Sequence, residues 1–314
     1  MNTRKTRVSL IFPYIGNDDE VRDKLILIIE AILEPEPGNN LNTSNMNPVL
    51  IVNKDTVYRG MFDKFKSYLR DQEKGDLLNE KKIDITPVWA VDTCQMWLGG
   101  FGKIIDDKKN NKEDNTSCVL QIPGDLQHVV GDFDDFLKNL SNLSALVETE
   151  RYNFVIGDFK VEPEKAKHLI DMFGTYPLTF NWFPDVARKV QNMNIKRPRS
   201  EFLAASLKFL EEILPFKRKF AYEETLALLI HALSDTQKKW KIGKVDIGVI
   251  RDYEQDRGFR EANDQIERME RLLKLLWREM NGGDKFDVDE FERLDRRSKA
   301  IREAAMVSLG NFLR

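Results

Sequence analysis

The stretch Cys118-Val-Leu-Gln-Ile-Pro-Gly-Asp-Leu-Gln-His128 indicates the fold class most directly. Its first five residues form a short apolar run with the length and composition of a fully buried strand. Pro123 and Gly124 end that strand, because proline has no N–H to give a neighbouring strand and glycine tolerates turn geometry. Asp125 then follows at the carboxyl end, the edge of an open α/β sheet where ligands bind. We therefore expect a ligand site beside this strand.

Two interpretations of Asp125 follow from its place after the strand. Its carboxylate, next to Gln127 and His128, suits a divalent metal that binds through oxygen and in turn holds a diphosphate. Aspartate is also a preferred residue at helix N-caps, so Asp125 suits the start of a following helix as well. The residues alone leave both interpretations open.

The segment Gly124-Asp-Leu-Gln-His128 resembles the second half of the Asp-Ala-Asp-Leu-Gln-His motif of family-2 glycosyltransferases of the dolichyl-phosphate mannose synthase type. The resemblance implies a GT-A fold and transfer of a sugar from a nucleotide diphosphate sugar. It also implies that Asp125 holds Mg²⁺ or Mn²⁺ and that Gly124 and Gln127 lie at the donor. Pro123 stands where the family has its first aspartate, which implies a weaker metal or ribose contact.

The composition argues against several classes of protein. A formal net charge of −3 gives no electrostatic case for nucleic-acid binding. The two cysteines, Cys94 and Cys118, form neither a disulfide framework nor a metal-ligand spacing, and we expect a cytoplasmic protein. No run of about 18 apolar residues predicts a transmembrane helix, and the basic segment 1–7 is not followed by the apolar region of a signal peptide.

Strand and helix patterns alternate along the chain. Short apolar runs predict strands at 8–12, 48–52, 83–90, 152–157 and 240–250, the third with a break at Pro87. Apolar residues at helical spacing predict helices at 61–69, 133–146, 203–213 and 261–280. This alternation predicts an α/β domain with a central mixed sheet flanked by helices. We expect the domain to span residues 1–265, followed by a helical extension, 266–314, that packs on it or forms a homodimer contact.

The turn after the first strand, Pro13-Tyr-Ile-Gly-Asn-Asp-Asp-Glu20, is similar to the Pro-x-x-Asn-Glu turn of the family. The resemblance implies that Pro13, Tyr14 and Asp18 contact the nucleotide. An ordinary strand–turn–helix connection explains the same residues, because Asn and Asp are common helix caps.

Two further stretches precede Cys118. The second strand ends in an acidic turn in the family, and Asn53 and Asp55 are the nearest equivalents here, displaced from its usual Asp-Asp-Gly-Ser form. The glycine-dense stretch Trp97-Leu-Gly-Gly-Phe-Gly-Lys103 suits a backbone cradle for phosphate or a flexible loop. It has neither the spacing of a P-loop nor that of a dinucleotide fingerprint.

Glu223 and Glu224 precede an apolar helical stretch and resemble the acidic pair of family-2 enzymes. The resemblance implies that one of them is the general base, since a sugar hydroxyl is a poor nucleophile until it is deprotonated. A phosphate acceptor needs no such base. Acids in the first turn of a helix are the other interpretation. His231, further along this stretch, is predicted to be a core histidine.

Basic residues occur in two later segments. Arg257 and Arg260, after the last predicted strand, resemble the basic loop that closes over the diphosphate in the family, which implies that they steady the leaving group. The segment Ile195-Lys-Arg-Pro-Arg-Ser-Glu-Phe202 is similar to the family's Asp-Pro-x-Ser-Gly-Phe. Its basic residues either meet a phosphate on donor or acceptor or form a solvated turn.

Two other functions are considered. The first is a catalytically degraded GT-A domain that serves as a binding or scaffold protein, which the substitutions at Pro123, Arg197 and Glu201 favour. The second is a nucleotidyltransferase of the same fold, but the turn 13–20 lacks the Gly-rich basic loop that such enzymes carry after the first strand. A metal-assisted glycosyltransferase with a nucleotide diphosphate sugar donor and an unidentified acceptor is the main prediction.

Overall fold

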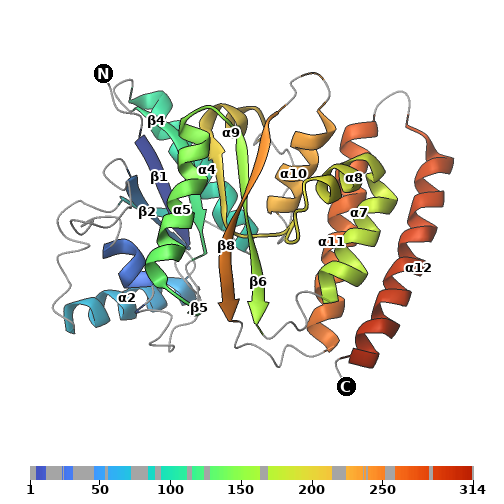
Figure 1. The fold of residues 1–314 in the computed structure, drawn as a ribbon, viewed down its shortest axis with the longest axis horizontal. Helices are drawn as coiled ribbons and strands as arrows, with labels where there is room; N and C mark the ends of the chain where they lie inside the picture. Colours follow the sequence, from blue (N-terminus) through green and yellow to red (C-terminus); the bar gives the residue numbers. More distant parts are fainter. Residues whose placement is uncertain are drawn as a thin grey trace.

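The described strands form one mixed sheet in the order β3-β2-β1-β4-β7-β6-β8-β5 (Figure 1). The computed structural model of the chain describes residues 5–11, 23, 25–30, 46–53, 56–71, 84–88, 93–111, 115–123, 128–162, 169–213, 224–235, 237, 240–251, 259–282 and 286–312. Helices lie on both faces of the sheet, so the predicted α/β class with a central mixed sheet is confirmed.

Most described strands run in the same direction. The parallel strands are β1 (Lys5–Ile11), β2 (Met46–Asn53), β3 (Asp84–Val88), β4 (Thr116–Ile122), β6 (Phe154–Glu162) and β8 (Ile242–Arg251). The antiparallel strands are β5 (His128–Val130), which pairs with β8, and β7 (Leu203–Ser206), which lies between β4 and β6. The carboxyl ends of the parallel strands therefore share one edge of the sheet, called the carboxyl edge below.

Strand β4 shows why this sheet is buried on both faces. Its side chains alternate, so that Cys118 and Leu120 enter one apolar cluster and Val119 enters the other. All three are at most 1% exposed, which matches the continuous apolar run of a doubly covered strand.

Two groups of helices cover the faces. The first contains α2 (Thr56–Asp71), α5 (Phe133–Glu148) and the helical residues 25–30. The second contains α4 (Thr93–Asn110), α7 (Tyr176–Trp182), α8 (Pro184–Asn192), α9 (Leu207–Ile213), α10 (Glu224–Ser234) and α11 (Phe259–Asn281). A π-helical turn, η1 (Asp171–Thr175), leads into α7, and α12 (Val288–Phe312) packs outside against α7, η1 and α11. Figure 1 shows α11 and α12 side by side at the far end of the sheet.

Three local predictions are wrong. Residues 203–206, expected to begin a helix, form strand β7, because β4 and β6 provide backbone partners on both sides. Pro87 does not break its strand but pairs in register with Val52, which an edge strand such as β3 tolerates. The glycine-dense stretch 97–103 is neither a loop nor a phosphate cradle. It lies within α4, where fully buried Trp97 and Phe101 anchor the helix.

Helix α11 runs through residue 265, where the sequence places the start of the helical extension. Side chains on both sides of that position, including Ala262 and Met269, belong to the same apolar cluster as α7 and α10. None of the helices in the part of the chain that the structure describes is long and apolar enough to cross a membrane.

Candidate functional site

The strand order reverses at β1, and this places a candidate site at the carboxyl edge. Leu10 of β1 pairs with Ile122 at the end of β4, while Ile11 pairs with Ile51 near the end of β2. Strand β2 therefore lies on one side of β1 and strand β4 on the other. In open α/β sheets ligands bind outside the carboxyl ends of the strands at such a reversal.

Most of the residues that the sequence assigns to a donor or acceptor site lie outside the described residues. They are Pro13, Tyr14, Asp18, Asp55, Gly124, Asp125, Gln127, Glu223 and Arg257. The strands that precede most of them are described, however, and β1, β2, β4 and β8 all end at the carboxyl edge. The segments that carry these residues therefore start from the same edge, except for Glu223, which precedes α10.

For three further predicted site residues the structure gives the backbone position. Asn53 is the last residue of β2 and pairs with Val88 of β3. Glu224 is the first residue of α10, as expected of an acid in a first turn, and Arg260 lies in the first turn of α11. Asn53 is at the carboxyl edge, and α11 begins only after the segment that leaves β8 at this edge.

The junction of β4 and β7 brings residue 201 to the end of β4. The Gln121 side chain is fully buried and its Nε2 donates to the Glu201 carbonyl at 3.0 Å. Pro123, directly after β4, is buried as well, whereas Glu201 is exposed. The backbone of Glu201 therefore lies beside the strand end at which the motif's first aspartate is replaced by proline.

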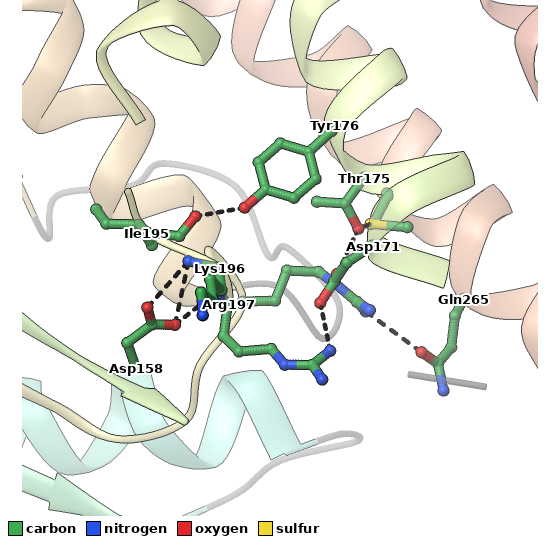
Figure 2. Close-up of polar contacts among 10 residues, drawn as sticks. Asp158, Asp171, Thr175, Tyr176, Ile195, Lys196, Arg197 and Gln265 are labelled. Atoms are coloured by element: carbon green, nitrogen blue, oxygen red, sulfur yellow. Dashed lines mark hydrogen bonds and ion pairs between the residues drawn. The ribbon is translucent and has the colours of Figure 1, made fainter. Parts of the chain in front are cut away.

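A group of largely buried charged and polar side chains, called the Asp171 cluster, joins the segment that leads into β7 to η1 and α11 (Figure 2). It consists of Asp171 and Thr175 of η1, Arg197, Arg199 and Gln265. Asp171 Oδ2 is 3.2 Å from Arg197 Nη1, and Asp171 Oδ1 is 2.8 Å from Arg199 Nε. Thr175 Oγ1 donates to Asp171 Oδ1 at 2.7 Å, and Arg199 Nη1 donates to Gln265 Oε1 at 3.3 Å. One carboxylate thus serves two guanidinium groups.

Asp158 of β6 fixes the backbone of the same segment. Its carboxylate accepts the backbone N–H of Lys196 at 3.1 Å and that of Arg197 at 2.9 Å, and Lys244 Nζ lies 3.4 Å away. Ser200 adds a hydrogen bond from Oγ to the Gly157 carbonyl at 2.5 Å. The segment is therefore held along β6 before it enters β7.

The interpretation of 195–202 as a solvated basic turn is wrong for its two arginines. Arg197 is 6% exposed and Arg199 is largely buried, because Asp171 draws both guanidinium groups inward. Lys196 is exposed, and only its backbone N–H takes part in the contacts to Asp158.

Burial sets the protonation state of three other side chains. It raises the pKa of the Tyr176 hydroxyl, which Asp171 and Asp158 raise further, so the group stays protonated and donates to the Ile195 carbonyl. It also raises the pKa of the Cys118 thiol, which makes this cysteine an unreactive core residue. His231 of α10 is half-buried, and burial lowers its pKa to about 4.

The sequence does not predict Asp158 and Asp171 as polar centres. Asp158 had one usable signal, since it follows directly after a predicted buried strand that ends at a ligand-binding edge.

The predicted metal ligand, Asp125, lies outside the described residues. Within the described ranges no group of three or more His, Cys, Asp and Glu side chains could hold a metal ion. Comparison with known proteins finds no family model that matches this chain and no curated protein that matches it.

Proposed function

We propose that this chain is a metal-assisted glycosyltransferase of GT-A-like fold, which moves a sugar from a nucleotide diphosphate sugar to a hydroxyl or phosphate acceptor. The observation that carries the proposal is the common edge at which β1, β2 and β4 end. The segments predicted to contact the nucleotide and the metal follow these three strands. Separate motifs in the sequence therefore start from one place in the fold, where open sheets bind ligands.

Each predicted residue has a distinct task in this reaction. The bond between the sugar carbon and the donor diphosphate breaks, and a bond from that carbon to the acceptor oxygen forms. Glu224 or Glu223 takes the proton of an acceptor hydroxyl. Arg257 and Arg260 neutralise charge on the leaving diphosphate. The metal that Asp125 would hold supplies further positive charge at the same diphosphate.

A catalytically degraded domain that binds a partner is the second candidate. Buried Pro123 favours this candidate, because proline offers no metal ligand at the end of β4, where the family motif has its first aspartate.

Thermal unfolding with a panel of nucleoside diphosphates, each with and without Mn²⁺, tests the proposal. A ligand at about 100 times its Kd stabilises the folded chain by about 2.7 kcal/mol. We expect a Mn²⁺-dependent shift with one base, lost in Asp125→Asn and kept in the matched control Asp135→Asn, which changes an exposed acid of α5. No shift with any diphosphate would contradict the transferase and favour the degraded domain.

A further inference from the structure

Helix α12 is buried on one face only. Leu294 and Leu309 are at most 5% exposed on its inner face, which packs against α7, η1 and α11. Successive helical residues are about 100° apart, so the opposite, outer face runs through Ala300, Ala304 and Val307. All three are exposed. Figure 1 shows α12 as the outermost helix at its end of the molecule, with no other described element over this face.

The middle of the outer face carries small and apolar side chains. Val307 is 67% exposed, the largest exposed fraction among the large apolar side chains of the described residues. Ala300 and Ala304 precede it on the same face. Small side chains allow two helices to pack near the short end of the usual distance between axes, about 8–10 Å. A helix with apolar side chains on both faces is expected to be covered on both.

Two opposite charges flank this strip in an order that complements itself. Arg296 precedes Ala300 by four residues and Glu303 follows it by three, so both lie on the same side of the strip. The Arg296 side chain is 72% exposed, and its Nη1 is 3.9 Å from Glu292 Oε2, at the far limit of an ion pair. Glu303 is exposed and makes no hydrogen bond or ion pair to another described residue. Both charges are therefore open to a partner.

An antiparallel second copy of α12 matches this order. When the two-fold axis passes beside Ala300, Arg296 of each copy lies opposite Glu303 of the partner subunit, because their distances from Ala300 differ by one residue, about 1.5 Å. A parallel copy would set each residue level with its own equivalent, so that like charges face each other. Moving the axis to residue 303 would bring two Glu303 carboxylates together, which disfavours that register.

We propose that the chain forms an isologous dimer in which the outer faces of two α12 helices pack antiparallel about Ala300. The two Arg296–Glu303 pairs set its orientation and register, and the strip of Ala300, Ala304 and Val307 supplies its apolar contact. A single pair of helices buries less than the about 1,600 Å² of a standard interface, so we expect a weak dimer with a Kd on the order of 10 μM. The dimer stands independently of the proposed glycosyltransferase function.

Sedimentation equilibrium of the full chain tests the charge pairs. We expect Arg296→Glu and Glu303→Arg each to weaken the dimer at least about tenfold, because each sets like charges opposite one another twice. The double variant, Arg296→Glu with Glu303→Arg, is expected to restore the wild-type Kd. Arg188→Glu is the matched control, since it reverses the same charge on the exposed surface of α8. Both positions on α12 are exposed, so we expect these variants to fold, and thermal unfolding checks this.

Cysteine cross-linking tests the register. Ala300→Cys places two thiols beside the two-fold axis, within the Cα separation that a disulfide spans. Ala304→Cys is the control on the same face, because its two copies lie about 12 Å apart along the helices, too far for a disulfide. We expect oxidation to give a covalent dimer with Ala300→Cys and not with Ala304→Cys, above the background of the wild type with Cys94 and Cys118.

Three results would overturn the dimer: a wild-type chain that stays monomeric at about 100 μM, a double variant that does not recover, or cross-linking through residue 304 rather than 300. An anionic membrane is the other occupant to test, since Arg293, Arg296 and Arg297 lie on the same helix. Vesicles with and without an anionic lipid decide this. Binding of a monomeric wild type to the anionic vesicles, lost in Arg296→Glu, would assign the outer face to a membrane surface instead.

Discussion

Two groups of buried charge in the described part of the chain differ in which charge is kept from water. In the Asp171 cluster the cations are buried, since the side chains of Arg197 and Arg199 are 7% and 13% exposed. The second, called the Glu270 cluster, joins α11 to α12 and contains Glu270, Lys274, Asp295, Lys299 and Arg302. There the acid is buried, with Glu270 only 2% exposed, whereas Lys274 and Arg302 are 23% and 33% exposed.

This difference determines how the cations of each cluster complete their hydrogen bonds. In the Glu270 cluster each cation reaches water and can complete its hydrogen bonds there, so the ion pairs serve to join two helices. Lys274 bridges Glu270 of its own helix and Asp295 of α12. The arginines of the Asp171 cluster are largely withdrawn from water, so their ion pairs with Asp171 are more costly to break.

The largest effect is expected for Asp171→Asn. The substitution removes the one carboxylate between two buried guanidinium groups, and breaking a buried pair in this way costs about 3–5 kcal/mol. Urea unfolding at pH 7 measures the loss. A cost below about 1 kcal/mol would place the cluster among solvated ion pairs.

Acid unfolding is expected to depend first on His231 and only later on the acids of the Glu270 cluster. Burial lowers the pKa of His231 to about 4, from an ordinary value of 6.5. Between these values the unfolded chain takes up the proton and the folded chain does not. The contribution is therefore present in full above pH 6.5 and falls by up to about 3 kcal/mol as the pH drops to 4.

The Glu270 cluster loses stability in a lower range of pH. Burial raises the pKa of Asp295, but hydrogen bonds from Lys274 and Lys299 lower it on balance below its ordinary 3.8. Its contribution is present above that value and is lost as the pH falls further. Urea unfolding at several pH values measures both ranges, and His231→Leu is expected to flatten the range from 6.5 to 4. An unchanged slope in this variant would show that another group titrates there.

The sequence predicts elements whose cause is local. Strand β4 and helices α5 and α11 follow from apolar runs and helical spacing, and the expected start of α5 at Phe133 is confirmed by its N-cap, Asp132. Strand β7 was missed because Leu203-Ala-Ala-Ser206 suits a helix by composition and becomes a strand only between β4 and β6. The sequence does not predict helix α4, because the glycines of 97–103 indicate a loop, whereas the helix is held by buried Trp97 and Phe101.

The candidate site also has one part that the sequence predicts and one part that it does not. That the segments after β1 and β4 start from one edge follows from the rule for parallel strands, and the structure confirms the strand pairing on which it depends. The Asp171 cluster follows no local pattern, because Asp171 binds residues 26 and 28 positions away through packing of η1 against the segment before β7. Charge alone leaves a phosphate contact and a solvated turn open, and the burial of the two arginines argues against the solvated turn.

The smallest effects test whether the Glu270 cluster is structural. Glu270→Gln is expected to cost about 1–2 kcal/mol, less than Asp171→Asn, because Arg302 can turn to water and Lys274 keeps Asp295. Lys299→Ala is the exposed control, since Lys299 is 56% exposed and its 3.0 Å pair with Asp295 is worth at most about 0.5 kcal/mol. A loss in Glu270→Gln as large as that in Asp171→Asn would mean that the exposure of the cations makes no difference, and the distinction between the two clusters would then be wrong.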